Sequence, residues 1–164
     1  MLAVGYCFFP EKLVVWKQEY QSISNRDNDR MPYKVLVADD DEGQRKSHGF
    51  ALEVVTAILG DEIEIIETAT SVETWAKIKS EIFNLIILDN DFKDNNLKGH
   101  LPGIALLQLA KKEGPNRSTP TFFCSADAYD TLKSMVEKYG GIYLPKVGYD
   151  IEKVAQLFAE KMQK

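Results

Sequence analysis

Four segments of the sequence that are typical of buried strands each end in polar side chains that could act together chemically. In chain order these are Asp39, Asp40 and Asp41, then Asp89 with Asp91 behind it, then Ser125, and finally Lys146. If the strands are parallel, their carboxyl ends meet at one edge of the sheet. We therefore expect these groups to converge at the edge where open α/β sheets bind ligands.

Crowded carboxylates repel one another unless a cation binds between them. Carboxylate oxygens of this kind suit Mg²⁺, which is usually held by one or two acids together with water and phosphate oxygens. A hydroxyl and an ammonium beside such a site are suited to holding a transferring phosphoryl group, because they interact with its equatorial oxygens. A carboxylate is then a reasonable nucleophile, and the product would be an aspartyl phosphate.

The scaffold that would position these groups is predicted from alternating strand and helix patterns. Short β-branched or solidly apolar runs alternate with segments of helical period, which indicates an α/β fold with a parallel sheet and helices on both faces. The strand patterns cover 33–39, 62–69, 84–89, 119–126 and 142–146, and the helical patterns cover 43–60, 72–82, 104–114, 129–141 and 150–164.

Within the helices, the sequence makes smaller predictions. Gly60 should end the first helix, and Ser71 should be the N-cap of the second. His48 is interpreted as a surface histidine, and Cys124 as a small buried strand residue. By helical spacing, Phe50, Val54 and Ile58 should share one face, and Val154 and Phe158 should face the core. Trp75, at helical spacing with Ile78 and Ile82, is interpreted as a core residue.

Composition excludes several classes of function. The 164 residues carry a net charge of −5, so no basic surplus is available for phosphate backbones and we expect no nucleic-acid partner. Cys7 and Cys124 are far apart, which argues against a disulfide framework or a zinc site. The apolar start "MLAVGYCFF" is too short to span a bilayer and lacks signal-peptide features, so we expect a cytoplasmic protein without a membrane partner.

Residues 1–32 stand outside the alternation and are treated as an N-terminal extension of a domain at 33–164. The stretch "PEKLVVWKQEYQ" has the spacing of a short helix, and "SISNRDNDRMP" reads as a linker. Three interpretations stay open: a helix docked on its own domain, a partner-binding or dimerising arm, and an over-long gene start ahead of Met31. The sequence leaves the oligomeric state open, a dimer included.

Four motifs resemble the strand ends of the response-regulator receiver domain, the phosphoacceptor module of two-component signalling. They are "KVLVADDDEGQR", "NLIILD", "TFFCSA" and "IYLPK", and the resemblance covers about residues 33–163. Their specificity lies in the ordered set of acids, acid, hydroxyl and lysine. The resemblance implies a flavodoxin-like, doubly wound sheet in the strand order 2-1-3-4-5, like that of chemotaxis regulators.

The resemblance also implies roles for individual residues. Asp89 matches the family's phosphoacceptor, and the Mg²⁺ ligands correspond to Asp39, Asp40, Asp89 and the backbone carbonyl of Asp91. Ser125 matches the switch hydroxyl, Lys146 the lysine, and Tyr143 the aromatic residue whose rotation accompanies activation. Asp41 is interpreted as an N-cap or a solvated acid.

By the same resemblance, the phosphoryl donor would be a histidine kinase or a histidine phosphotransfer protein. The protein would be a signalling phosphoacceptor rather than an enzyme. It would contact a downstream protein through the face formed by 129–141, 142–146 and 150–164. We expect a stand-alone receiver that acts through protein contacts, or a member of a phosphate relay.

Two departures from the family pattern lie near the site. The loop after Asp89 carries about six extra residues in "KDNNLKGHL", either as a tolerated surface loop or as a lid whose Lys98 and His100 reach incoming phosphate. Proline precedes Lys146, at Pro145, instead of following it. Two other functions stay open: a degenerate receiver used only as an interaction module, and a haloacid-dehalogenase-type phosphatase, which "LIILDND" also resembles.

Overall fold

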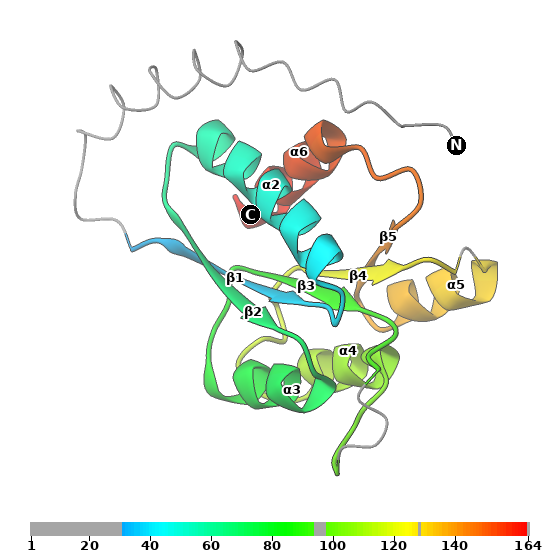
Figure 1. Ribbon diagram of the computed structural model, residues 1–164. Coiled ribbons are helices and arrows are strands. Elements are labelled where there is room, and N and C mark those ends of the chain that lie inside the picture. The colour runs from blue at the N-terminus through cyan, green and yellow to red at the C-terminus, as the bar shows by residue number, and fades with distance from the viewer. Residues whose placement is uncertain (1–30, 94–97, 128, 164) are drawn as a thin grey trace.

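The computed structural model describes residues 31–93, 98–127 and 129–163, which form five strands and five helices (Figure 1). The strands are β1 (Tyr33–Ala38), β2 (Ile63–Thr68), β3 (Leu85–Asp89), β4 (Thr121–Ser125) and β5 (Ile142–Pro145). The helices are α2 (Glu42–Leu59), α3 (Ser71–Ser80), α4 (Gly103–Lys112), α5 (Asp130–Lys138) and α6 (Ile151–Met162).

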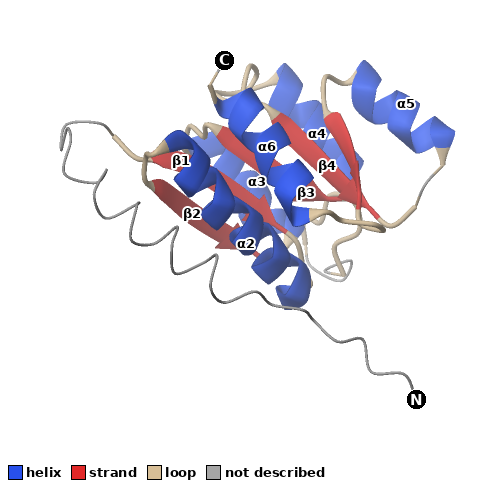
Figure 2. Ribbon diagram, turned by 90° about the horizontal axis from the view of Figure 1, so that it is seen from above, coloured by secondary structure: helices blue, strands red, loops and turns tan. Residues whose placement is uncertain are grey.

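All strand pairs are parallel, and the sheet has the order β2-β1-β3-β4-β5. Helices α2 and α6 cover one face, and α3, α4 and α5 lie on the other (Figure 2). The predicted doubly wound, flavodoxin-like fold is therefore confirmed. Because every strand runs the same way, the strand ends that carry the candidate residues reach the same edge of the sheet.

The central strands are apolar on both sides because helices cover both faces of the sheet. Every residue of β3 and β4 is buried. Successive side chains point to opposite faces, so Ile87 and Phe122 pack beneath α2 and α6, whereas Leu88 and Phe123 pack against α3 and α4. The sheet is thus a rigid layer between two cores, and this fixes the edge at which the site lies.

Several helix predictions are confirmed. Gly60 ends α2 in the left-handed conformation, with φ of 73°. Val154 and Phe158 are buried on α6, and Cys124 is buried in β4.

The predicted N-cap of α3 is wrong by one residue. The N-cap is Thr70 and not Ser71: the Thr70 hydroxyl accepts a hydrogen bond from the Glu73 N–H, while Ser71 is buried inside the helix.

One expectation about burial is wrong. His48 is 1% exposed rather than on the surface, because α2 packs it inward against Tyr149. Trp75 is partly buried and packs against the core that contains Ile78, whereas Ile82 is 69% exposed because α3 ends at Ser80 and the helical spacing does not continue to it. The side of α2 that carries Phe50, Val54 and Ile58 is largely outward, since Phe50 and Ile58 are exposed. The buried residues of α2 are His48, Ala51, Leu52 and Val55.

The predicted N-terminal helix and linker lie, up to residue 30, outside the described residues. Met31 and Pro32 lead into β1, where the Tyr33 N–H donates to the Glu62 carbonyl at 2.9 Å. Among the helices of the described ranges, none combines the length and the apolar character needed to cross a bilayer.

Gly103 brings the start of α4 directly against the end of β3. A Cβ at this position would lie 2.1 Å from the backbone oxygen of Asp89 and 2.8 Å from Asn90 Cα. We expect Gly103→Ala to lower the free energy of unfolding by about 2 kcal/mol, the cost of forcing a methyl group into a packed region. Urea denaturation of the purified protein measures it.

Gly49 provides the matched control, because it lies within α2 and a Cβ there meets nothing within 4 Å. Gly49→Ala should leave stability unchanged or raise it by up to about 1 kcal/mol, since alanine is the better helix residue. Equal effects of the two substitutions would contradict the close approach of α4 to β3.

Candidate functional site

The carboxyl edge of the sheet brings together the residues predicted from the strand ends. Asp39 and Asp40 follow β1, Asp89 ends β3, Ser125 ends β4 and Lys146 follows β5. The main chain holds this edge in register: the Asp39 N–H donates to the Thr68 carbonyl at 3.1 Å, and the Lys146 N–H donates to the Ser125 carbonyl at 2.9 Å. The site is therefore built on strand ends fixed by the sheet.

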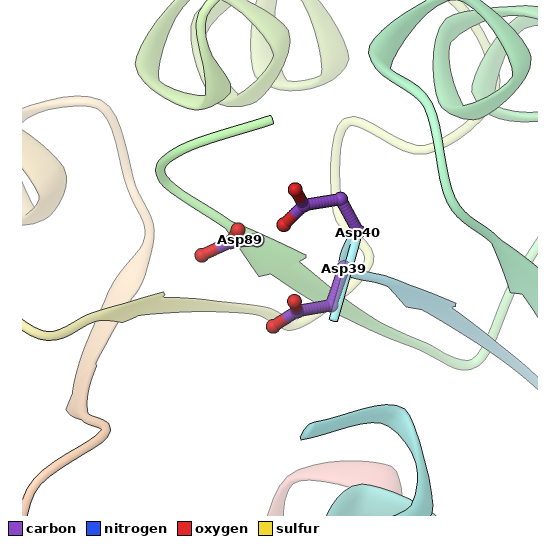
Figure 3. Close-up of side chains that lie close together, drawn as sticks. All are labelled: Asp39, Asp40 and Asp89. Carbon is purple, nitrogen blue, oxygen red and sulfur yellow. The ribbon is translucent and has the colours of Figure 1, made fainter. Parts of the chain in front are cut away.

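Three of these residues form an acidic cluster (Figure 3). One oxygen from each of Asp39, Asp40 and Asp89 lies within 4.8 Å of the others. Asp39 is 1% exposed and Asp89 2%, while Asp40 is partly exposed. Such close carboxylates in a poorly hydrated place repel one another, so the cluster favours a cation.

Lys146 supplies one positive charge to this cluster. Its Nζ lies 2.8 Å from Asp39 Oδ2 and 2.7 Å from Asp89 Oδ1, so it bridges the two buried acids. Burial works against the charged ammonium, but the contacts with Asp39 and Asp89 outweigh it and raise the pKa of Lys146 to about 12. Lys93, on the loop after β3, approaches Asp40 at 3.3 Å and is largely exposed.

Asp89 differs from an ordinary surface carboxylate. Burial raises its pKa and the negative charge of Asp39 adds to this, although Lys146 and the Asp91 N–H act in the opposite direction. The ionised form of Asp89 therefore depends on the positive charge next to it. A carboxylate in this state is poorly solvated, which suits a nucleophile better than a purely structural acid.

The oxygen donors fit a magnesium ion. Asp39 Oδ1 accepts a hydrogen bond from the Asp41 N–H at 2.9 Å. Asp39 Oδ2 is buried and faces the Lys146 ammonium, but it accepts no directed hydrogen bond from the described residues. Carboxylate oxygens of Asp39, Asp40 and Asp89 together are the hard donor set that Mg²⁺ prefers. The Asp91 side chain is exposed and lies outside this set, so the role of its backbone carbonyl stays a prediction.

Ser125 and Tyr143 both contact the backbone of Asp127, in the loop after β4. The Asp127 N–H donates to Ser125 Oγ at 3.0 Å, and the Tyr143 hydroxyl donates to the Asp127 carbonyl at 2.5 Å. Ser125 is buried, and Tyr143 is partly buried against the core on the α4 side of the sheet. A displacement of Ser125 would therefore be passed to Tyr143 through the backbone of Asp127.

Two nearby residues have roles that sequence reasoning missed or left open. Arg45 Nη1 donates to the Asp39 carbonyl at 2.7 Å, and its Nε pairs with Glu67 Oε2 at 3.2 Å, so it ties β1, β2 and α2 together beside the acids. In the sequence, the only indication of this role of Arg45 was the position of a basic residue one helical turn after the N-cap. Asp41 is that N-cap, and its side chain accepts a hydrogen bond from the Gln44 N–H at 3.0 Å.

The long loop after Asp89 is described except for residues 94–97. At its end, His100 Nδ1 lies 3.2 Å from Ser71 Oγ, and the Leu101 N–H donates to the same oxygen at 3.1 Å. These contacts fix 100–101 on the first turn of α3. Lys98 is exposed, and reach of either side chain toward phosphate stays a prediction.

The fold and the strand-end site together define a flavodoxin-like α/β domain with an acidic site at its carboxyl edge. No protein-family model and no curated protein matches the chain. Solved structures do match. A CheY-like response regulator receiver domain from Methanospirillum hungatei shares 25% identity at a TM-score of 0.64, over 81% of this chain and 95% of that one. A chemotaxis response regulator of Vibrio cholerae shares 20% at 0.62, over 80% and 99%.

The receiver domain of a Pseudomonas aeruginosa sensor histidine kinase, described with a magnesium ion coordinated in its active-site cleft, is 13% identical. It superposes with a TM-score of 0.62 over 82% of this chain and all of that one. The chain therefore has the fold of a response-regulator receiver domain, and the resemblance predicted from the strand-end motifs is confirmed.

Proposed function

We propose that the protein is a signalling phosphoacceptor that takes a phosphoryl group on Asp89 from a phosphohistidine donor, with Mg²⁺ as cofactor. The donor would be a histidine kinase or a histidine phosphotransfer protein. The observation that carries the proposal is the buried Asp89 carboxylate, held 2.7 Å from Lys146 and clustered with Asp39 and Asp40. A purely structural acid would not need two further acids facing it at a sheet edge.

In the proposed reaction an Asp89 oxygen forms a bond to phosphorus while the bond from phosphorus to the imidazole nitrogen of the donor breaks. The donor nitrogen keeps the bonding electron pair, and the imidazole leaves as neutral histidine because its other ring nitrogen carries a proton taken up from water. Asp39 and Asp40, with Asp89, would hold the Mg²⁺, which offsets the charge between the carboxylate and the incoming phosphate. Lys146, already between the acids, would contact a phosphoryl oxygen.

Ser125 and Tyr143 would pass the change to the surface. The Ser125 hydroxyl accepts a hydrogen bond from the Asp127 N–H, so its own hydrogen is available to a phosphoryl oxygen. A movement of Ser125 toward that oxygen would shift Asp127, and with it the hydroxyl contact of Tyr143. The face of α5, β5 and α6 would then change its affinity for a downstream protein, as a shift between two populations.

The test is incubation of the full chain with acetyl phosphate and Mg²⁺, followed by intact-protein mass spectrometry. We expect the mass of one phosphoryl group to appear with Mg²⁺ and to be absent with EDTA. No mass increase and no response to beryllofluoride would instead favour an interaction module without phosphochemistry. Sustained turnover of a small phosphate ester would favour the phosphatase alternative.

A further inference from the structure

A buried histidine on α2 is hydrogen-bonded to the loop that carries Lys146. His48 Nδ1 lies 2.9 Å from the hydroxyl of Tyr149, and the two rings meet edge to face at 5.4 Å and 71°. His48 is 1% exposed. The contact joins residues 101 positions apart in sequence, so it ties α2 to the segment between β5 and α6.

The loop between Lys146 and Asp150 is exposed at its first two residues. Val147 is 75% exposed, and Gly148 has a φ of +73° with open space around the position of a Cβ. At one end the Lys146 N–H is bonded to Ser125, and at the other Asp150 caps α6 by accepting from the Lys153 N–H. Tyr149, partly buried against the core beneath α2 and α6, is the inward anchor between these two ends.

The protonation state of the pair suits a fixed contact. Burial lowers the pKa of His48 to about 4, and the charge of Lys146 adds to the effect, so the ring is neutral at neutral pH. Burial also raises the pKa of Tyr149, so its hydroxyl keeps its proton. His48 Nε2 has no hydrogen-bond partner among the described residues. An apolar residue would avoid that cost, which indicates that the histidine is used for its other nitrogen.

We propose that His48 and Tyr149 are positioning residues, which hold the β5–α6 loop so that the Lys146 ammonium stays between Asp39 and Asp89. The proposal concerns the same site as the proposed function, and its kinetic part rests on that function. Neither residue touches the acidic cluster through a described contact. Their effect on phosphoryl transfer would pass through Lys146.

Tyr149→Phe is the sharpest variant, because it removes only the hydroxyl and keeps the ring. We expect amide exchange at residues 147–149 to rise about fivefold, the factor that corresponds to one net hydrogen bond. The rate of phosphorylation by acetyl phosphate should fall by a similar factor. His48→Leu should act like Tyr149→Phe, whereas His48→Asn, which keeps a polar atom near the position of Nδ1, should recover part of both losses.

Tyr33→Phe is the control, since Tyr33 is also partly buried against this core but starts β1 at the opposite end of the sheet. Tyr33→Phe should change neither the amide exchange at residues 147–149 nor the phosphorylation rate. A structural role is separated from positioning by repeating Tyr149→Phe in a Lys146→Met background. If Tyr149 acts through Lys146, adding Tyr149→Phe to Lys146→Met should leave the residual phosphorylation rate unchanged.

An equal loss of rate in both backgrounds would overturn the proposal, as would unchanged amide exchange in Tyr149→Phe. If the native chain is not phosphorylated at all, the proposed function fails, and the exchange of residues 147–149 in the Tyr149 and His48 variants still decides whether the pair holds the loop.

Discussion

Asp89→Asn is expected to abolish phosphorylation by acetyl phosphate while leaving the protein folded. The amide cannot act as the nucleophile, so no mass increase should appear at any Mg²⁺ concentration. Burial and the charge of Asp39 raise the pKa of Asp89, which means that the folded protein disfavours its ionised form. Without Mg²⁺, the free energy of unfolding should therefore be unchanged or higher by up to about 1 kcal/mol. Intact mass and urea denaturation measure the two quantities.

Asp91→Asn is the matched control, two residues further along the same loop. Asp91 is exposed, and its predicted metal contact uses the backbone carbonyl, which asparagine keeps. Phosphorylation should therefore persist in this variant. Phosphorylation of the Asp89→Asn variant would mean that another residue is the phosphoacceptor. An equal loss of phosphorylation in both variants would mean that the Asp91 side chain takes part.

Lys146→Met is expected to affect both stability and phosphorylation. Lys146 lies within 2.8 Å of Asp39 and Asp89, whose side chains are almost fully buried, so methionine leaves two close carboxylates without their cation. Removing one partner of a buried ion pair costs about 3 kcal/mol of stability. The phosphorylation rate should fall about a hundredfold, as when one electrostatic contact to a transition state is removed.

The loss of stability in Lys146→Met should depend on pH. Asp89 has a raised pKa in the folded protein, and without Lys146 the pKa should rise further, so the folded state binds a proton more readily than the unfolded chain. Protonation relieves the repulsion with Asp39. The stability difference between the native protein and Lys146→Met should therefore shrink as the pH falls toward the pKa of Asp89, and it should also shrink when Mg²⁺ is added.

Lys153→Met is the control for the loss of a lysine, because Lys153 is exposed and pairs with Asp150 on the surface of α6. It should change stability by less than about 1 kcal/mol. If Lys146→Met lowers stability by no more than Lys153→Met does, the Lys146 ammonium does not offset the repulsion between the buried acids.

Helix burial is the feature about which the sequence was least informative. Periodicity assigns residues to the sides of a helix, but the buried side depends on the partner that packs against it. On α2 the sequence grouped Phe50, Val54 and Ile58, whereas α2 buries the neighbouring side, with Ala51 and Val55. The helical pattern extended to Ile82, whereas α3 stops two residues earlier, because helix ends are poorly marked by apolar spacing.

The sequence by itself determined the fold and the composition of the site. Apolar runs bounded by turns specified the parallel strands, and parallel strands must end at one edge, so the acids, Ser125 and Lys146 had to meet there. The tertiary structure alone decided that Lys146 lies between Asp39 and Asp89, that Arg45 holds the Asp39 backbone, and that His48 is buried against Tyr149. These contacts join side chains from different elements, and local periodicity carries no information about which distant side chain will fill a given space.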